Sequence, residues 1–205
     1  MARNVFVSFR FSDGEKYKNE LCEKFKSEDV IDYSEDEDRS SMSDESIQKY
    51  LYNKLKRTSI TIIILTPDAV NHKKNFFGQY DDWMYDEIRY SLEDRSENRT
   101  NGLIALYTSE AEGLLYTNST HTCDKCKVEK CVKNINDFDN LVRKNMMNVK
   151  SYYKENACEG LYDSLKDSYC SLVSFDSFLN NMDFYLDETI EKRERKDEFN
   201  LCKRM

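Results

Sequence analysis

Residues 59–66 read Ser-Ile-Thr-Ile-Ile-Ile-Leu-Thr, a nearly continuous apolar and β-branched stretch. The strands of a parallel sheet are covered by helices on both faces, so they carry continuous apolar runs and not alternating ones. Pro67 follows directly, and proline cannot donate to the hydrogen-bond ladder of a central strand. This stretch therefore predicts a central strand of a parallel sheet that ends at Pro67.

Further strands and helices alternate with this central strand. Apolar runs predict strands at residues 4–9, 30–33, 102–107 and 169–173, and helical periodicity predicts helices at 15–26, 44–57, 82–94 and 176–196. Such alternation produces right-handed βαβ units and an open parallel sheet. Residues 108–167 show no clear period, so we expect them to form an insertion.

The fold class expected from this pattern is α/β. We expect one domain over residues 1–205, a three-layer sandwich around a parallel five-stranded sheet in flavodoxin-like order. Its core should comprise residues 1–107 and 168–196, with the insertion at 108–167 before the last strand. Another doubly wound strand order is the alternative.

The composition argues against several classes of protein. The 205-residue chain has a formal net charge of −8 and no basic stripe, which argues against a nucleic-acid partner. The apolar run Ile60–Leu65 is far shorter than the about 20 residues that span a bilayer, and the N-terminal residues lack a signal peptide's apolar segment. We therefore expect a cytoplasmic protein with no membrane partner, whose seven cysteines are thiols or metal ligands and not disulfides.

The absence of several known motifs argues against further kinds of active site. The five glycines are not closely spaced, so the chain has neither a GxGxxG fingerprint nor a phosphate-cradling GxxxxGK loop. The two histidines, His72 and His121, lie in no serine-hydrolase or metalloprotease signature. Any catalysis is therefore expected to use carboxylates.

A polar loop follows the first strand, at the sheet edge where open α/β proteins bind ligands. The sequence there is VFVSFRFSD, residues 5–13. Phe9 could stack on a nucleotide ring and Arg10 could hold its phosphates, which makes them candidate cofactor-binding residues together with Asp13. Alternatively, Phe9 is a core residue and Arg10 a solvated loop charge.

A second candidate lies at the start of the helix predicted at residues 82–94. Trp83 and Glu87 are four residues apart and so share one helix face. A partly desolvated carboxylate beside an indole could stabilise an oxocarbenium ion developing at a ribose. Alternatively, Trp83 anchors the core and Glu87 is a surface residue.

Three short motifs occur in the order seen in TIR domains. VFVSFR ends the first strand at residues 5–10, ILTP ends the central strand at 64–67, and WMYDEI starts the next helix at 83–88. The chain thus resembles the TIR domain family. Residues 142–150 and the tail from residue 168 onward also resemble a bacterial TIR-like family of formerly unknown function, related to the TIR-like component of the Thoeris anti-phage system.

This resemblance implies a function and roles for individual residues. In TIR domains that cleave NAD, a Trp-x-x-x-Glu helix carries the catalytic glutamate, which implies that Glu87 is catalytic and that Trp83 shields it. Phe9 and Arg10 would line the nucleotide cleft. NAD would be the substrate, and the products would be nicotinamide with ADP-ribose or a cyclic or conjugated ADP-ribose signal. The implied setting is bacterial antiviral defence, with self-association or an effector protein that responds to the signal.

Two other function classes compete with the NAD-consuming enzyme. The first is a non-catalytic TIR-like module that binds nucleotides or other proteins. The second is a receiver-like signalling domain, which is disfavoured because no Lys follows the last predicted strand at Val173. The chain also departs from TIR domains in the loop at residues 34–43, which is acidic. TIR loops that close over substrate often have apolar or aromatic tips, and the only such side chains here are Tyr33 and Met42.

A cluster of potential metal ligands lies in the insertion. His121, Cys123, Cys126 and Cys131 fall within one short stretch, and Cys-x-x-Cys is a chelating spacing for zinc. These four residues are candidate ligands of a structural zinc ion. Free thiols are the favoured interpretation, because the gap between Cys126 and Cys131 is wider than in a usual zinc knuckle, and a redox pair is a further alternative.

Overall fold

The computed structural model describes residues 3–34, 44–71, 83–94, 99–138, 141–155, 158 and 161–204. The strands are β1 (Arg3–Ser8), β2 (Val30–Asp32), β3 (Ile60–Leu65), β4 (Gly102–Tyr107), β5 (Tyr116–Thr122), β6 (Glu129–Ile135) and β7 (Cys170–Ser174). The helices are α1 (Phe11–Phe25), α2 (Asp44–Leu55), α3 (Pro67–Val70), α4 (Trp83–Leu92), α5 (Glu112–Leu115), α6 (Leu141–Lys144), α7 (Phe175–Asn180) and α8 (Met182–Glu194), followed by the 3-10 turn η1 (Lys196–Glu198).

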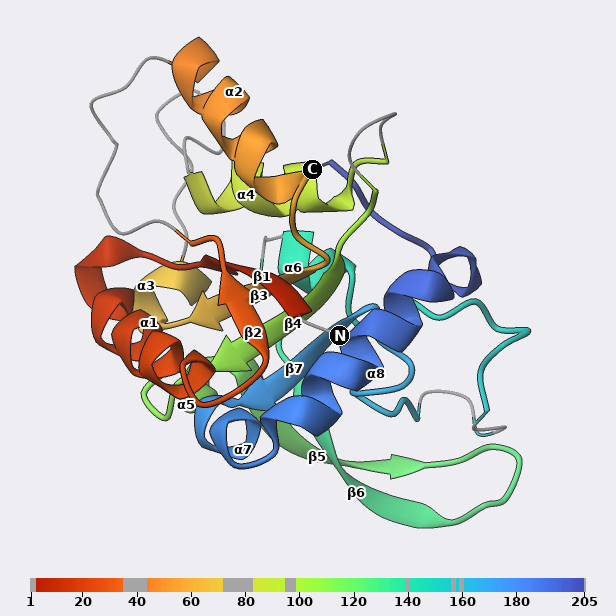
Figure 1. The fold of residues 1–205 in the computed structure, drawn as a ribbon. Coiled ribbons are helices and arrows are strands. Elements are labelled where there is room, and N and C mark those ends of the chain that lie inside the picture. The colour runs from red at the N-terminus through yellow and green to blue at the C-terminus, as the bar shows by residue number, and fades with distance from the viewer. Residues whose placement is uncertain are drawn as a thin grey trace.

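A five-stranded parallel sheet forms the centre of the molecule (Figure 1). Its strand order is β2-β1-β3-β4-β7, and every neighbouring pair is parallel. The register places Ile62 beside Ile104 and Leu106 beside Val173. This confirms the predicted α/β sandwich with a flavodoxin-like sheet, since β1 is followed by β2 on one side and by β3 on the other.

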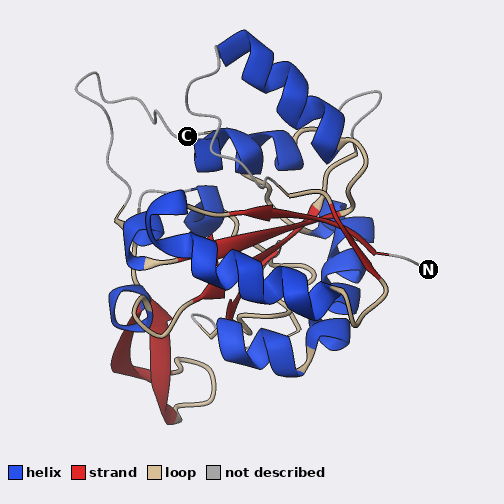
Figure 2. Ribbon diagram, turned by 60° about the vertical axis from the view of Figure 1, so that its left-hand side comes forward, coloured by secondary structure: helices blue, strands red, loops and turns tan. Residues whose placement is uncertain are grey.

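Helices cover both faces of the sheet (Figure 2). On one face, α1, α7 and α8 bury Leu21, Phe178 and Leu186 against the sheet. On the other face, α4 packs Met84 and Ile88 against β3 and β4. The strands are consequently apolar on both faces, and six of their side chains are at most 1% exposed: Phe6, Val7, Ile62, Ile64, Ile104 and Leu106.

The predicted helix at 176–196 consists of two helices and a 3-10 turn. Ser174 caps the start of α7, where its hydroxyl accepts a hydrogen bond from the backbone N–H of Ser177 at 3.2 Å. Asn181 ends α7, because its side-chain amide donates to the carbonyl of Ser177 at 3.3 Å and its backbone leaves helical geometry. The break reflects this local capping, which the apolar periodicity does not reveal.

The interval between β4 and β7 contains regular structure of its own. Strands β5 and β6 form an antiparallel hairpin that projects away from the central sheet (Figures 1 and 2). The second part of the interval returns to the core, where Leu141, Val142 and Met146 pack in the same cluster as β3 and β4. Phe199, beyond the last predicted helix, joins this cluster as well.

Candidate functional site

The polar site lies where the strand order reverses, at the carboxyl ends of β1 and β3. Ligands of open α/β sheets bind in the crevice at such a reversal, because the loops that leave the two strands diverge there. Ser8 ends β1, and Thr66 directly follows β3. Among the described residues, two carboxylates contact them: Glu87 accepts a hydrogen bond from Ser8, and Asp13 accepts one from Thr66.

Asp13, in the first turn of α1, ties that turn to the segment after β3. Its Oδ1 accepts a hydrogen bond from the Thr66 hydroxyl at 2.6 Å, and its Oδ2 accepts one from the backbone N–H of Asp68 at 3.0 Å. Ser12 adds a third link by donating to Asp68 Oδ2 at 2.7 Å. Both oxygens of Asp13 are therefore used by the protein, which favours a role in setting the shape of this edge.

Glu87 is brought to the same edge by helix α4. Met84 and Ile88 are four residues apart, and both face the core. Position 87 is next to them on the helix surface, so its side chain lies partly between α4 and the sheet. The side chain of Glu87 is 8% exposed, and its Oε2 accepts a hydrogen bond from the Ser8 hydroxyl at 2.6 Å. The predicted catalytic glutamate thus lies directly at the end of β1.

A second polar contact fixes the register of α4 on the sheet. The hydroxyls of Thr61 and Ser91 lie 2.7 Å apart in the buried interface, and Ser91 also donates to the carbonyl of Glu87 at 2.8 Å. Asn101 extends the network by donating to Thr61 at 3.2 Å. Buried hydroxyls and amides that find partners in this way hold the helix in one position on the sheet.

The three other predicted cofactor-binding residues have different surroundings. Phe9 lies in the core with 9% exposure, and its ring centroid is 4.7 Å from that of Phe11, which agrees with the alternative interpretation of this residue. Arg10 is half-buried, and its carbonyl accepts the Gly14 N–H at 2.7 Å. Trp83 begins α4, but its side chain lies outside the described residues.

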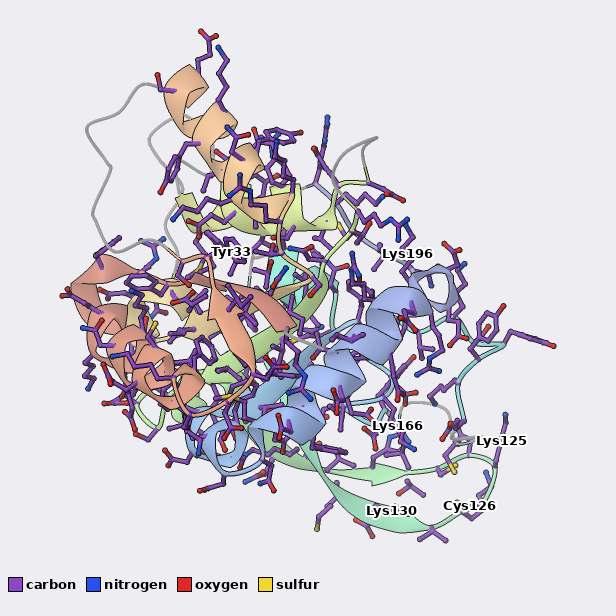
Figure 3. All side chains as sticks on the ribbon, in the orientation of Figure 1. Tyr33, Lys125, Cys126, Lys130, Lys166 and Lys196 are labelled. Carbon is purple, nitrogen blue, oxygen red and sulfur yellow. The ribbon has the colours of Figure 1, made fainter. Side chains whose placement is uncertain are left out.

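Two stretches that border this edge in sequence also lie outside the described residues. They are residues 35–43, which include Met42 and nearly all of the acidic loop, and residues 72–82, which include His72. Tyr33 precedes the first of them, and its backbone N–H donates to the carbonyl of Val5 at 2.8 Å (labelled in Figure 3).

A separate group of cysteines lies at the tip of hairpin β5–β6. The sulfurs of Cys123, Cys126 and Cys158 all lie within 4.8 Å of one another and could hold a metal ion. The pKa of Cys123 is lowered to about 7, chiefly by a backbone N–H from Cys126 and by the Cys158 side chain, and the pKa of Cys158 is raised by the same sulfurs. Cys123 therefore loses its proton more readily than Cys158 does.

This group differs from the predicted ligand set. Within the described part of the chain, His121 and Cys131 do not join the close group. His121 lies opposite Lys130 and Cys131 opposite Thr120 in the hairpin ladder, away from the turn that carries Cys123 and Cys126. Cys158 takes part instead, and no local spacing marks it because it is far away in sequence.

Two further observations complete this description. No protein family model matches the chain. Among the described helices, none is both long enough and apolar enough to cross a membrane.

Proposed function

We propose that this chain is a TIR-like enzyme that consumes NAD by cleaving the bond between nicotinamide and ribose. The observation that carries the proposal is the Glu87 carboxylate, held by Ser8 at the reversal of strand order. NAD is proposed as the substrate because the sequence motifs around Ser8 and Glu87 occur in the same order as in TIR domains.

The chemistry requires a fixed negative charge next to the ribose. When the C–N bond breaks, its electron pair leaves with nicotinamide and positive charge develops on the ribose. A carboxylate in a desolvated site stabilises that charge more strongly than one in water. Water then adds to the ribose, giving ADP-ribose and a proton, or a hydroxyl group adds and gives a cyclic or conjugated product.

The surrounding residues have supporting roles in this proposal. Ser8 holds one oxygen of Glu87 and so orients the other oxygen. Arg10 contributes positive charge for the phosphates of NAD, and the resemblance to TIR domains assigns Trp83 the role of shielding the carboxylate. Phe9 supports the cleft from within the core. Bacterial antiviral signalling is the proposed setting, with self-association or an effector protein as partner, and structural zinc is a further proposed component.

The second candidate is a non-catalytic module that binds nucleotides or proteins. The burial of Glu87 favours it, because little of the side chain reaches the surface of the described structure and Ser8 already satisfies one oxygen. In this case Glu87 would serve with Ser91 to fix α4 on the sheet.

Release of nicotinamide from NAD by the purified chain distinguishes the two candidates. We expect Glu87→Gln to lower the turnover by about 100-fold or more, because the amide lacks the charge that stabilises the transition state. Glu93→Gln is the matched control, since Glu93 is also on the α4 side of the sheet and is likewise 8% exposed. Chromatography with mass detection identifies the ribose product, and urea unfolding checks that both variants are folded.

The outcomes separate clearly. Equal turnover in wild-type protein and Glu87→Gln would exclude Glu87 as the catalytic residue. NAD binding without nicotinamide release, both in dilute solution and under crowding conditions that promote assembly, would favour the non-catalytic module.

A further inference from the structure

Hairpin β5–β6 has little hydrophobic support along its length. Most positions of both strands are exposed on both faces, and an isolated two-stranded hairpin is at best marginally stable in water. Its base is held by the ring of Tyr116 against Tyr107 and by the ion pair of Lys133 with Glu112. The tip lies at the opposite end of the strands, so a stable hairpin needs a second attachment there.

The tip is folded in a way that brings the Cys123 and Cys126 sulfurs together. Its backbone forms a tight turn, because Cys123 N–H donates to Val128 at 3.1 Å and Lys127 N–H donates to Cys123 at 2.8 Å. Lys127 has a φ of 57°, in the left-handed region. This turn aims the backbone N–H groups of Lys125 and Cys126 at the Cys123 sulfur. Backbone N–H groups in this position can donate to a cysteine sulfur that binds a metal, as outer-shell partners of metal ligands do.

With the sulfur of Cys158, the distances between the three sulfurs suit the tetrahedral coordination of a zinc ion. A zinc ion with bonds of about 2.3 Å to sulfur places its sulfur ligands roughly 3.8 Å apart. The sulfurs of Cys126 and Cys158 are 3.9 Å apart, and all three lie within 4.8 Å of one another. The Cys158 backbone is also held in place, because Lys154 Nζ donates to its carbonyl at 2.7 Å.

We propose that Cys123, Cys126 and Cys158 bind one zinc ion as three thiolates, with a solvent molecule as fourth ligand, and so fasten the hairpin tip to the Cys158 segment. Thiolates select zinc over harder cations such as magnesium. Each thiol gives up its proton when the ion binds, and the resulting site carries one net negative charge. Lys125 and Lys127 flank Cys126 in sequence, and Figure 3 shows Lys125 near Cys126 at the tip.

Metal analysis of the full chain, purified under reducing conditions, tests the ligand set. We expect about one zinc per chain in wild-type protein and a loss of most of it in Cys158→Ser. Cys131→Ser is the matched control, because Cys131 is an exposed cysteine of the same hairpin but lies outside the group. X-ray absorption should show three sulfur ligands and one lighter atom. Four sulfurs, or zinc lost from Cys131→Ser and kept by Cys158→Ser, would overturn the proposed ligands.

Limited trypsin digestion tests whether the ion fastens the tip. Lys125 and Lys127 provide cleavage sites there, so removing zinc with a chelator should speed cleavage at the tip by about tenfold or more, while the core stays protected. Cys158→Ser should be cleaved as fast without chelator. Equal cleavage with and without zinc would refute the fastening role. Zinc-free protein that contains a Cys126–Cys158 disulfide under non-reducing mass spectrometry would refute the site itself.

Discussion

Lys192 should make the stability of this protein rise with pH in the alkaline range. Its side chain is 1% exposed, and its ammonium donates to the carbonyls of Leu165 and Ser168, both at 3.1 Å, and to the Ser171 hydroxyl. Burial outweighs the attraction of Cys170 and lowers the pKa of Lys192 from 10.5 to about 8. The charged form is therefore less favourable in the folded protein than in the unfolded chain.

The sign and the size of the effect follow from this shift. Between pH 8 and 10.5 the unfolded chain binds more protons than the folded protein at this residue, so the free energy of unfolding rises with pH. The two pKa values give a rise of about 1.3 kcal/mol between pH 7 and pH 9. Burial of Cys170, which raises its pKa to about 12, opposes the rise only above the thiol's ordinary pKa of 9.

Urea unfolding of wild-type protein and Lys192→Met at pH 7 and pH 9 measures this contribution. Methionine keeps a long unbranched side chain but has no proton to lose, so the variant should lack the rise of about 1.3 kcal/mol. Cys123, with its pKa of about 7, titrates in both proteins and cancels in the comparison. If both proteins gain the same stability between the two pH values, Lys192 does not carry the effect.

Two further substitutions test packing and the polar edge of the sheet. A Cβ at Gly102 would lie 2.5 Å from the Thr189 carbonyl oxygen, so Gly102→Ala should destabilise the protein by about 1–3 kcal/mol in urea unfolding. Gly113→Ala, where a Cβ would meet nothing within 4 Å, should not lower the urea midpoint, and a similar loss in both would contradict the steric argument. Asp13→Ala leaves the Thr66 hydroxyl without its acceptor and should cost about 1–3 kcal/mol, whereas an unchanged unfolding midpoint would show that the link between α1 and the segment after β3 is unimportant.

The central sheet could be predicted from the sequence because its strands are apolar on both faces. β3 and β4 lie where their continuous apolar runs predict them, and β1 and β7 are displaced by one residue from the predicted bounds. Hairpin β5–β6 could not be found in this way. Both of its faces are exposed, so no alternation of apolar and polar residues marks its strands.

The candidate site was predictable in part. The helical spacing around Glu87 and the strand end at Ser8 are both visible in the sequence, but their 2.6 Å contact depends on how α4 lies on the sheet. Cys123 and Cys126 were predicted together because they are neighbours in the chain. The spacing in sequence grouped Cys131 with them and gave no sign of Cys158, since only tertiary folding determines which distant cysteine reaches the turn.

The long connection between β4 and β7 affects the folding kinetics. Strand β4 is buried at nearly every position, yet its partner β7 follows only after residues 108–169. Each doubling of a connection costs only about 0.6 kcal/mol in closure entropy, but contacts so distant along the chain form late. Until β7 arrives, β4 is an unpaired apolar edge, the kind of surface through which partly folded chains associate. The insertion therefore lowers the stability of the folded sheet only slightly, but it increases the risk that the partly folded chain aggregates.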